Sequence, residues 1–515
     1  MNEPDDATAE DVRGHDNPLG DDPLTASRLS QHTARVAEAS YPYRYERTAS
    51  AAEIHERHPD LGPSEETDDA VVVAGRVMLL RSFGKLVFAT IQDHSDRIQL
   101  FMESKTLGDT AFGAIDDVDL GDWVGAGGTV MTTKTGEVSV RVHYVDLLQK
   151  SLRPLPEKWH GLQDVELRSR QRYLDLIVNA EAKSVALARA AIVSELRRQF
   201  ESRGYIEVET PVLLSQATGA LARPFATHHH ALGMPMYLRI ATELYLKRLV
   251  VGGLERVFEI GRIFRNEGVD ATHNPEFTML ESYEAFADYG DIATMVEEII
   301  LALATELSES AVITYRDRPL DLTPPFRRVR MVDLVAEAVG SSVDFDAPLD
   351  EVREMARGHG VDPEPHWRHG RILEGLFDAH VADGIWEPTF VMDHPKETSP
   401  LAREHRDDAN LTERWELFIA GAEYANAFSE LNDPLDQRVR FEMQAAARER
   451  GDEEAHPIDE DYLHALEYGL PPTGGLGIGV DRLVMLLTDR HHIREVILFP
   501  TLRPERPAGG DEAHD

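Results

Sequence analysis

Five short runs of alternating apolar and polar residues lie close together in the first third of the chain. They span residues 71–80, 86–93, 97–103, 122–133 and 138–148, with turn signals such as Phe83-Gly84-Lys85 and Lys134-Thr135-Gly136 between them. A period of two is typical of a half-buried β-strand. Five such strands in so short a stretch favour a small barrel, and the five-stranded oligonucleotide-binding (OB) fold is one solution. A barrel with a purely structural role fits the same pattern.

After the predicted barrel, apolar residues recur with the spacing of a helix. Apolar residues from Val185 to Phe200 recur on one face of a helix predicted over 181–203, and a strand is predicted over 205–213. The pattern of residues 330–395 predicts mainly helices, and that of residues 27–39 predicts one further helix. We therefore expect five parts: an acidic N-terminal extension, partly helical or disordered, over 1–69; the barrel over 70–149; a connector over 150–180; an α+β domain over 181–505; and a disordered tail over 506–515.

Residues 263–283, IFRNEGVDATHNPEFTMLESY, form two alternating segments around a polar loop. Because alternate side chains of a strand share a face, Arg265 and Glu267 are expected on one surface of the first arm. Phe277, Glu281 and Tyr283 share a face of the second arm. The guanidinium suits a phosphate or carboxylate, and the phenylalanine offers a stacking face for a planar ring. A solvated face with a surface ion pair is the competing interpretation.

The stretch PTGGLGIGVDRLVMLLT, at 472–488, has glycine at alternate positions. Gly475, Gly477 and Gly479 would leave one face of a strand as bare backbone, which permits close approach by a ligand. Asp481 is expected to cap the helix that follows, with Arg482 beside the bare floor. A dinucleotide-binding fingerprint is the rival interpretation, but G-x-G-x-G departs from its G-x-G-x-x-G spacing.

The third stretch, RWELFIAGAEYANAFSELND at 414–433, contains two strand-like arms joined by a short turn. Glu416 and Glu423 can converge across this hairpin. Two carboxylates without Cys or His suit a hard cation such as Mg2+, especially one that bridges substrate phosphates. Asn426, Phe428 and Glu430 share one face of the second arm. A polar strand edge is the alternative.

Composition narrows the class of protein. The chain has 515 residues, 42% of them hydrophobic and 28% charged, and it has no Cys, so disulfides and thiolate metal sites are excluded. No apolar run approaches the roughly 18 residues of a membrane span, so a cytoplasmic enzyme is expected. The formal net charge is −39, and 45 of the 53 basic residues are Arg while eight are Lys. Such acidity disfavours generic polyanion binding and indicates a solubility or high-salt adaptation, although local basic patches would still permit a nucleic-acid partner.

Taken together, these stretches resemble the class II aminoacyl-tRNA synthetases. The matches to the family's motifs 1, 2 and 3 are IVSELRRQFESRGYIEVETPVL at 192–213, RVFEIGRIFRNEGVDATHNPEFTMLESYE at 256–284 and GGLGIGVDRLVML at 474–486. Further segments resemble the class II lysyl-tRNA synthetases in particular: 153–177, 243–253, 428–434 and 467–482. The resemblance covers roughly residues 70–504. It implies an α+β catalytic domain, an antiparallel sheet with flanking helices, preceded by an all-β OB-fold barrel.

The resemblance also implies roles for single residues. Arg265 and Arg482 would be catalytic, and Phe277 and Arg482 would sandwich the adenine. The implied ATP-binding residues are Arg265, Glu267, His273, Asn274, Phe277, Glu416 and Arg482. The implied lysine-binding residues are Gly219, Glu243, Arg265, Glu281, Tyr283, Asn426, Phe428, Glu430 and Gly477. Mg2+ would bind Glu416 and Glu423, and Arg81, Phe88 and Gln99 would stack on and read the central anticodon base.

The residues themselves support a lysine substrate. Glu243, Glu281 and Glu430 would place three carboxylates around one pocket, and a substrate with two ammonium groups needs such partners when it is buried. The implied function is the ATP-dependent activation of L-lysine and its transfer to the 3′-end of tRNA(Lys), by a homodimer without membrane association. In so acidic a chain, Arg168, Arg170 and Arg172 would then form a local track for the tRNA backbone.

Some features depart from the family pattern or leave alternatives open. Thr242 stands where bacterial relatives are expected to have Pro, and Ala427 stands where Gly is common and is expected to narrow the pocket slightly. A paralogue that lysylates a protein is one alternative, but such relatives usually lack the barrel. An inactive RNA-binding paralogue is another, but it would be expected to lose Arg265, Arg482 or the acidic pair.

Overall fold

The structure is a computed structural model that describes residues 22–38, 41–156, 162–216, 218–219, 222–449 and 458–504. The predicted tail over 506–515 and the first 21 residues lie outside the described residues. The chain divides into two units between Gly161 and Leu162, and each unit is described by itself. No helix among the described residues is long and apolar enough to cross a membrane.

The first unit is built on a closed ring of five strands in the order β1-β2-β3-β5-β4. The strands are β1 (Glu66–Phe83), β2 (Leu86–Gln92), β3 (Arg97–Glu103), β4 (Trp123–Thr132) and β5 (Val138–Gln149). Alternate residues such as Val71, Val87, Leu100 and Val140 fill its core. The predicted barrel is therefore confirmed. The helices that accompany it among the described residues are α1 (Pro23–Glu38), α2 (Ala51–Arg57), α3 (Ser104–Leu107), α4 (Asp109–Gly113) and the 3-10 turn η2 (Ala114–Asp117).

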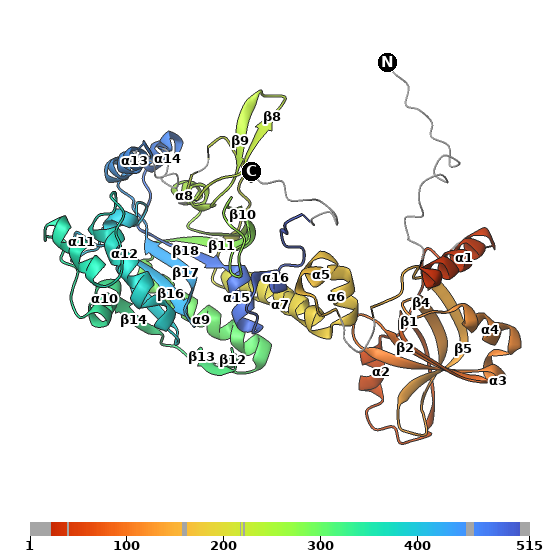
Figure 1. Cartoon of the computed structure of the whole chain (residues 1–515). Coiled ribbons are helices and arrows are strands. Elements are labelled where there is room, and N and C mark those ends of the chain that lie inside the picture. Colours follow the sequence, from red (N-terminus) through yellow and green to blue (C-terminus); the bar gives the residue numbers. More distant parts are fainter. Residues whose placement is uncertain are drawn as a thin grey trace, which may run out of the picture. The chain divides into compact units, whose positions relative to one another are not determined.

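The second unit is built on an eight-stranded sheet in the order β14-β15-β16-β17-β18-β11-β10-β6 (Figure 1). Its central strands are antiparallel, and only the end pairs β14–β15 and β10–β6 are parallel. The strands are β6 (Ile206–Glu207), β10 (Arg256–Phe264), β11 (Glu276–Ala285), β14 (Arg327–Arg330), β15 (Thr389–Met392), β16 (Arg414–Ile419), β17 (Ala422–Ser429) and β18 (Thr473–Gly479). The expected α+β domain with an antiparallel sheet is confirmed.

Helices α7 (Ala180–Ser202) and α9 (Tyr289–Ser308) cover one face of this sheet. Ile192 and Phe200 from α7 pack with Leu476 and Ile478 from β18 in one buried core. The alternation in β18 thus points its large apolar residues toward these helices, as the sequence predicts. The glycines between them face the other side, and the opposite face of the sheet is therefore free to carry the polar site.

The remaining elements surround this framework. The helices are α5 (Val165–Arg170), α6 (Arg172–Val178), α8 (Glu243–Val251), α10 (Met331–Val339), α11 (Leu349–Gly358), α12 (His369–His380), η3 (Ala382–Gly384), η4 (Lys396–Thr398), α13 (Pro434–Glu449), α14 (Glu460–Leu466), α15 (Val480–Leu487) and α16 (Ile493–Val496). Two small sheets contain β7 (Leu213–Leu214), β8 (Ala226–His229), β9 (Met234–Leu238), β12 (Val312–Tyr315) and β13 (Arg318–Asp321).

Two local predictions are wrong. The strand predicted over 205–213 is reduced to the short pieces β6 and β7, because β6 pairs with β10 through only two residues before the chain leaves the sheet. Asp481 does not cap α15, since the N-cap residue is Gly479 and makes no side-chain capping bond. The Asp481 carboxylate accepts instead from the backbone N–H of Thr278 at 2.6 Å and pairs with Arg189 at 2.6 Å.

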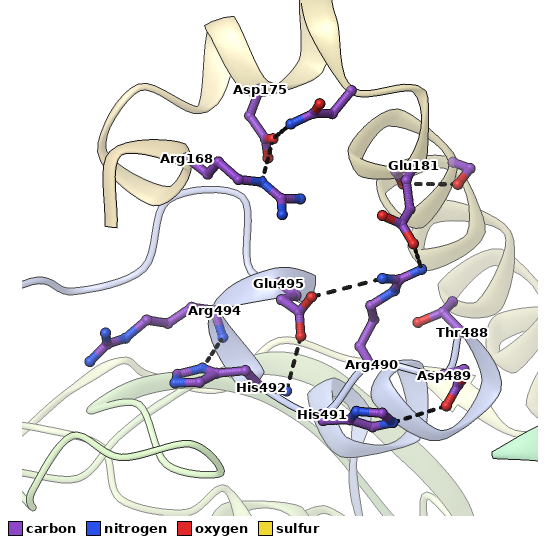
Figure 2. Close-up of polar contacts among 12 residues, drawn as sticks. Arg168, Asp175, Glu181, Thr488, Asp489, Arg490, His491, His492, Arg494 and Glu495 are labelled. Carbon is purple, nitrogen blue, oxygen red and sulfur yellow. Dashed lines mark hydrogen bonds and ion pairs between the residues drawn. The ribbon is translucent and has the colours of Figure 1, made fainter. Parts of the chain in front are cut away.

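The expected arginine track in α5 and α6 is also wrong in part. Arg172 is 4% exposed, and its guanidinium donates to Asp175 and to the carbonyls of Arg494 and Leu498. Arg168 binds the same aspartate at 2.8 Å (Figure 2). Both guanidiniums are bound to an internal carboxylate, and that of Arg172 also connects the start of the second unit to residues 494–498 near its end. They are therefore poorly placed for a phosphate backbone.

Candidate active site

The uncovered face of the large sheet carries a cavity of about 460 Å³. This volume is in the usual range for a site that binds a small molecule. The cavity is lined by β11, β16, β17 and β18, by the loop between β10 and β11, and by the starts of α8 and α15. All but one of the residues predicted to bind ATP, lysine or metal line it; the exception is Glu430.

Strand pairing sets these side chains in two rows across the sheet. Glu281 of β11 pairs with Gly477, Gly477 pairs with Asn426, and Asn426 pairs with Glu416. The bare floor predicted at Gly477 therefore separates Glu281 from Asn426, so that the side chains on either side face a shared space. A second row, two residues along each strand, contains Tyr283, Gly475, Phe428 and Arg414.

One end of the cavity is acidic, and we call the group Glu243, Glu281 and Tyr283 the acidic end. Glu281 is 5% exposed, and one of its oxygens accepts from the backbone N–H of Thr242 at 3.1 Å. Burial, together with the nearby carboxylate of Glu243, raises the pKa of Glu281 to about 7. A proline at position 242 could not donate this hydrogen bond, so the departure at Thr242 gives the glutamate a partner. The Tyr283 hydroxyl lies 3.4 Å from the other Glu281 oxygen.

Glu430 lies behind the acidic end and is 1% exposed. It does not line the cavity. Its carboxylate forms an ion pair with the ammonium of Lys247, a fully buried residue of α8 that also binds Glu243 at 2.5 Å. Lys247 has no place among the residues predicted from the sequence, because a Glu and a Lys four residues apart in a helix usually mark an exposed ion pair.

The other end of the cavity carries two arginines. β10 ends at Phe264, so Arg265 and Glu267 lie in the loop and not on the strand face that alternation predicted. Arg265 nevertheless enters the cavity, and its guanidinium carbon lies 5.3 Å from the centre of the Phe277 ring. Arg482 donates to the backbone carbonyl of Glu423 at 2.8 Å, and one of its nitrogens lies 3.3 Å from Nε2 of His273. We call Arg265, Arg482 and Phe277 the arginine end.

Glu416 and Glu423 lie on either side of the tight turn between β16 and β17, and both line the cavity. Their recessed position raises the pKa of both carboxyl groups, and Glu416 raises the pKa of Glu423 further. Glu416 pairs with Arg414 at 2.5 Å, and Glu423 lies 3.5 Å from Arg482. Within the described ranges, no group of three or more His, Asp or Glu side chains is arranged to bind a metal ion. A cation at this pair would therefore need further ligands from a substrate.

The remaining predicted residues occupy the rim and the loops. Gly219 is buried with φ +95°, a conformation that favours glycine, and it lies beside Ala241 and Glu243. The side chain of Asn274 is held by the carbonyl of Glu276 at 2.5 Å, so it fixes the loop as well as lining the cavity. Ala427 is 0% exposed and packs in the core below the sheet, so the expectation that it narrows the pocket is wrong.

The predicted anticodon residues also come together, on the outside of the barrel in the first unit. Arg81 of β1 pairs with Phe88 of β2, which pairs with Phe101 of β3, which pairs with Arg141 of β5. The rings of Phe88 and Phe101 are 5.4 Å apart, and Arg141 lies 5.8 Å from the Phe101 ring centre. Gln99 lies two residues from Phe101 on the same face and accepts from the Ser139 hydroxyl at 2.9 Å.

Sequence reasoning missed Arg414, Lys247, Phe101 and Arg141. For Arg414 a signal was present, because it alternates with Glu416 on one strand and must share its face. The same rule applied to Gln99 and Phe101. No comparable signal marks Lys247 or Arg141, whose positions depend on long-range pairing.

Comparisons with known proteins agree with this geometry. Residues 164–503 match the family model for tRNA synthetases class II (D, K and N), and residues 71–148 match the model for an OB-fold nucleic acid binding domain. The second match covers the barrel that carries the row of aromatic and arginine side chains.

Curated relatives match nearly the whole chain. The lysine–tRNA ligase of Enterococcus faecalis is 50% identical over 499 residues, which is 96% of this chain and 100% of the relative. That of Thermosynechococcus vestitus is 52% identical over 494 residues, covering 94% of this chain and 98% of the relative. That of Halalkalibacterium halodurans is 49% identical over 492 residues, with the same coverage. The chain therefore belongs to the family of class II tRNA synthetases that includes these lysine–tRNA ligases.

Proposed function

We propose that this protein is a lysine–tRNA ligase that activates L-lysine with ATP and transfers it to the 3′-end of tRNA(Lys). The observation that carries the proposal is the polarity of one cavity, with buried carboxylates at one end and two arginines beside an aromatic ring at the other. A di-ammonium substrate fits the first end, and a nucleotide triphosphate fits the second. The carboxylate of the amino-acid substrate then lies between the two ends, where it can react with the nucleotide.

The acidic end binds the two amino groups of lysine. Glu243 and the carbonyl of Gly219 accept from the α-ammonium, while Glu281, Tyr283 and Glu430 form the site of the ε-ammonium. Phe428, which faces the cavity from the second row, packs against the aliphatic part of the side chain. Asn426 and Arg265 hold the substrate carboxylate, and Gly477 keeps the floor between them open.

The arginine end binds ATP. Phe277 and Arg482 enclose the adenine, Glu267 accepts from its amino group, and Arg265 contacts the α-phosphate. His273 and Asn274 lie in the loop that borders the phosphates. Because Arg265 now lies against the Phe277 ring, binding of ATP requires its guanidinium to turn from the ring toward the phosphate.

Glu416 and Glu423 would hold Mg2+. The donor set fits, since hard carboxylate oxygens suit this ion and the mutual repulsion that raises the pKa of Glu423 would be relieved by a cation. When bound, the ion neutralises phosphate charge and so favours departure of pyrophosphate. Arg414, 2.5 Å from Glu416 and 3.2 Å from the Asn426 side chain, links this pair to the amino-acid end.

No protein nucleophile is needed for this reaction. An oxygen of the lysine carboxylate attacks the α-phosphorus, the bond to the bridging oxygen breaks, and pyrophosphate leaves. Arg265 orients the two reactants and stabilises the charge on the phosphorus centre, so catalysis rests on positioning and electrostatics. The 3′-OH of the terminal tRNA ribose then attacks the adenylate carbonyl, and AMP leaves.

The quaternary structure and location belong to the same proposal. Apolar side chains in the motif 1 segment, 192–213, and just before it are exposed, among them Leu187 at 60%, Ile206 at 51% and Leu213 at 48%. Such exposure supports a homodimer through this region, which sedimentation of the full chain would measure. A cytoplasmic location follows from the function, since charged tRNA is used there in translation.

Lysine-dependent exchange between ATP and pyrophosphate tests the proposal. We expect exchange with lysine and none with aspartate or asparagine, because those substrates would meet carboxylates where they need a cation or a neutral donor. Charging of purified tRNA then separates a tRNA ligase from an enzyme that modifies a protein. Exchange with another amino acid and not with lysine would refute the assignment, and tight tRNA binding without exchange would indicate an inactive relative.

The barrel gives a second expected result. We expect Phe88→Ala to raise the KM for tRNA about tenfold, because stacking of one base on an aromatic ring contributes about 1–3 kcal/mol. Lysine-dependent exchange without tRNA should be unchanged, since Phe88 belongs to the other unit. Phe112 of α4, a partly buried residue that packs against the barrel core, provides the control. Phe112→Leu is expected to leave the KM for tRNA unchanged, and equal effects of the two changes would argue against stacking.

A further inference from the structure

Lys247 is the most deeply buried cation beside the cavity. Its side chain is 0% exposed in the middle of α8. It is one of only eight lysines, in a chain that uses arginine for 45 of its 53 basic residues. A compact ammonium fits between two carboxylates in less space than the wider guanidinium needs. The choice of lysine at this position therefore calls for an explanation.

The contacts of Lys247 are those expected of the substrate. Its ammonium lies 2.5 Å from Glu243 and forms an ion pair with Glu430. It also lies 5.8 Å from the centre of the Tyr283 ring and 5.3 Å from that of Phe428. These four side chains are the ones assigned above to the amino groups and the aliphatic part of the lysine substrate.

Lys247 occupies only one side of Glu430. The ion pair uses Oε2. Both oxygens of Glu430 are buried without a hydrogen-bond partner among the described residues, Oε1 included. Oε1 lies against Gly475, where an added Cβ would stand 1.8 Å away. Gly475 lies in the second row of the sheet, between Tyr283 and Phe428, which both line the cavity. A buried carboxylate oxygen without a partner is costly, and an incoming ammonium group would satisfy it.

We propose that Lys247 is a built-in counter-ion that orients Glu243 and Glu430 and sets the net charge of the amino-acid pocket to match a substrate with two ammonium groups. Three carboxylates and one internal ammonium leave two negative charges, which the α- and ε-ammonium groups of lysine balance. The substrate carboxylate is left for Arg265. This inference rests on the proposed function and makes Lys247 a positioning residue that determines specificity.

The charged groups around Lys247 are consistent with this role. Glu243, Glu430 and the phenol of Tyr462 in α14 act on the charge of Lys247, and the Tyr283 ring lies beside it. Glu281 acts in turn on Glu430. Burial opposes the charged form of Lys247, but Glu243 and Glu430 outweigh it and raise the pKa of the ammonium. Burial raises the pKa of Glu430, and Lys247 limits that rise. Without the cation, Glu430 would hold its proton to a higher pH and would lose its attraction for an ammonium group.

Lys247→Gln and Lys247→Met test the proposal in the lysine-dependent exchange reaction. We expect the KM for lysine to rise about 30-fold, as when one partner of a buried charge pair is removed, and the KM for ATP to stay unchanged. The preference for lysine over 6-hydroxynorleucine, an analogue whose side chain ends in a neutral hydroxyl, should fall about tenfold or more. The reason is that the variant loses its discrimination by side-chain charge. Lys247→Arg, which keeps the charge, should restore part of that preference.

A pH series separates this role from a merely structural one. In the variants without the cation, the KM for lysine should fall as pH rises from 6 to 9, because lysine binds the ionised form of Glu430 and the pKa of that group is raised. Lys150→Met is the matched control, since Lys150 is 1% exposed between Asp119 at 2.6 Å and Asp122 at 3.0 Å in the first unit. It should leave the KM for lysine and its pH dependence as in the wild type.

The inference fails if Lys247→Gln keeps the wild-type KM for lysine, analogue preference and pH profile. It also fails if the KM values for lysine and ATP rise together, which would indicate general distortion. Should Lys247→Met not fold, Lys247→Gln, which keeps a hydrogen-bond donor on a side chain one atom shorter, provides the test alone. Failure of the proposed function is distinct, because the wild-type protein itself would then show no lysine-dependent exchange.

Discussion

Arg265→Ala is expected to reduce kcat/KM for lysine-dependent pyrophosphate exchange about a thousandfold, in line with the loss of a preorganised group that stabilises transition-state charge. Arg265 of the arginine end also faces the acidic end, since the Glu281 carboxylate acts on its charge. It can therefore hold the lysine carboxylate and the α-phosphate together. Most of the loss should fall on kcat, because the interaction is strongest when charge develops at phosphorus.

Steady-state exchange kinetics, with lysine and ATP varied separately, would measure this effect. Arg265→Lys should recover only a small part of the activity, because a single ammonium cannot replace the paired donors of the guanidinium. Arg262→Ala is the matched control: Arg262 lies three residues earlier on the exposed side of β10, 3.6 Å from Glu276 and outside the cavity. A comparable loss in Arg262→Ala, or none in Arg265→Ala, would contradict the assigned role.

The sequence predicts the parts of the fold that depend on local periodicity. The five barrel strands and the long helix now seen as α7 follow from periods of two and 3.6. The glycine floor of β18 follows too, because Leu476 and Ile478 alternate with residues that have no side chain, and both pack in the core. The prediction from alternation is wrong after Phe264, because the chain leaves the strand there while the alternating pattern of its sequence continues.

Sequence reasoning fails where tertiary contacts reverse a local meaning. Glu243 and Lys247 are four residues apart in α8, a spacing that ordinarily marks a solvated ion pair. Here, however, Lys247 is buried and also pairs with Glu430, the residue that follows β17. Arg172 is a second case of the same kind, since an exposed side chain was expected and a buried one, bound to Asp175 and the Leu498 carbonyl, was found. In each case a partner distant in sequence determines whether the charge faces water.

Thr242 shows a further limit. As a departure from the expected proline it carries no evident consequence in the sequence, because its side chain is neither charged nor aromatic. In the structure the consequence lies in the backbone of Thr242, whose N–H donates to Glu281. Burial raises the pKa of this glutamate to about 7. Backbone donors are invisible in a residue pattern, although they determine how a buried carboxylate is satisfied.

Gly475→Ala is expected to raise the KM for lysine about a hundredfold while leaving the KM for ATP unchanged, at the upper end of the usual cost of overpacking a tight site. The new Cβ would stand 1.8 Å from Oε1 of Glu430 and 2.7 Å from the Tyr283 ring. Neither neighbour can move aside easily. Glu430 is held from behind by Lys247, and Tyr283 is 3% exposed.

Gly474→Ala is the matched control, one residue away on the opposite face of β18. Its Cβ would meet Ile292 of α9 at 2.6 Å, so its cost should fall on the core and lower the Tm without a selective effect on lysine. Separate KM values for lysine and ATP, with thermal unfolding of both variants, would measure the contrast. If Gly475→Ala lowered the Tm but kept the wild-type KM for lysine, Glu430 would not form part of the amino-acid site, and the ε-ammonium would have to be bound by Glu281 and Tyr283 alone.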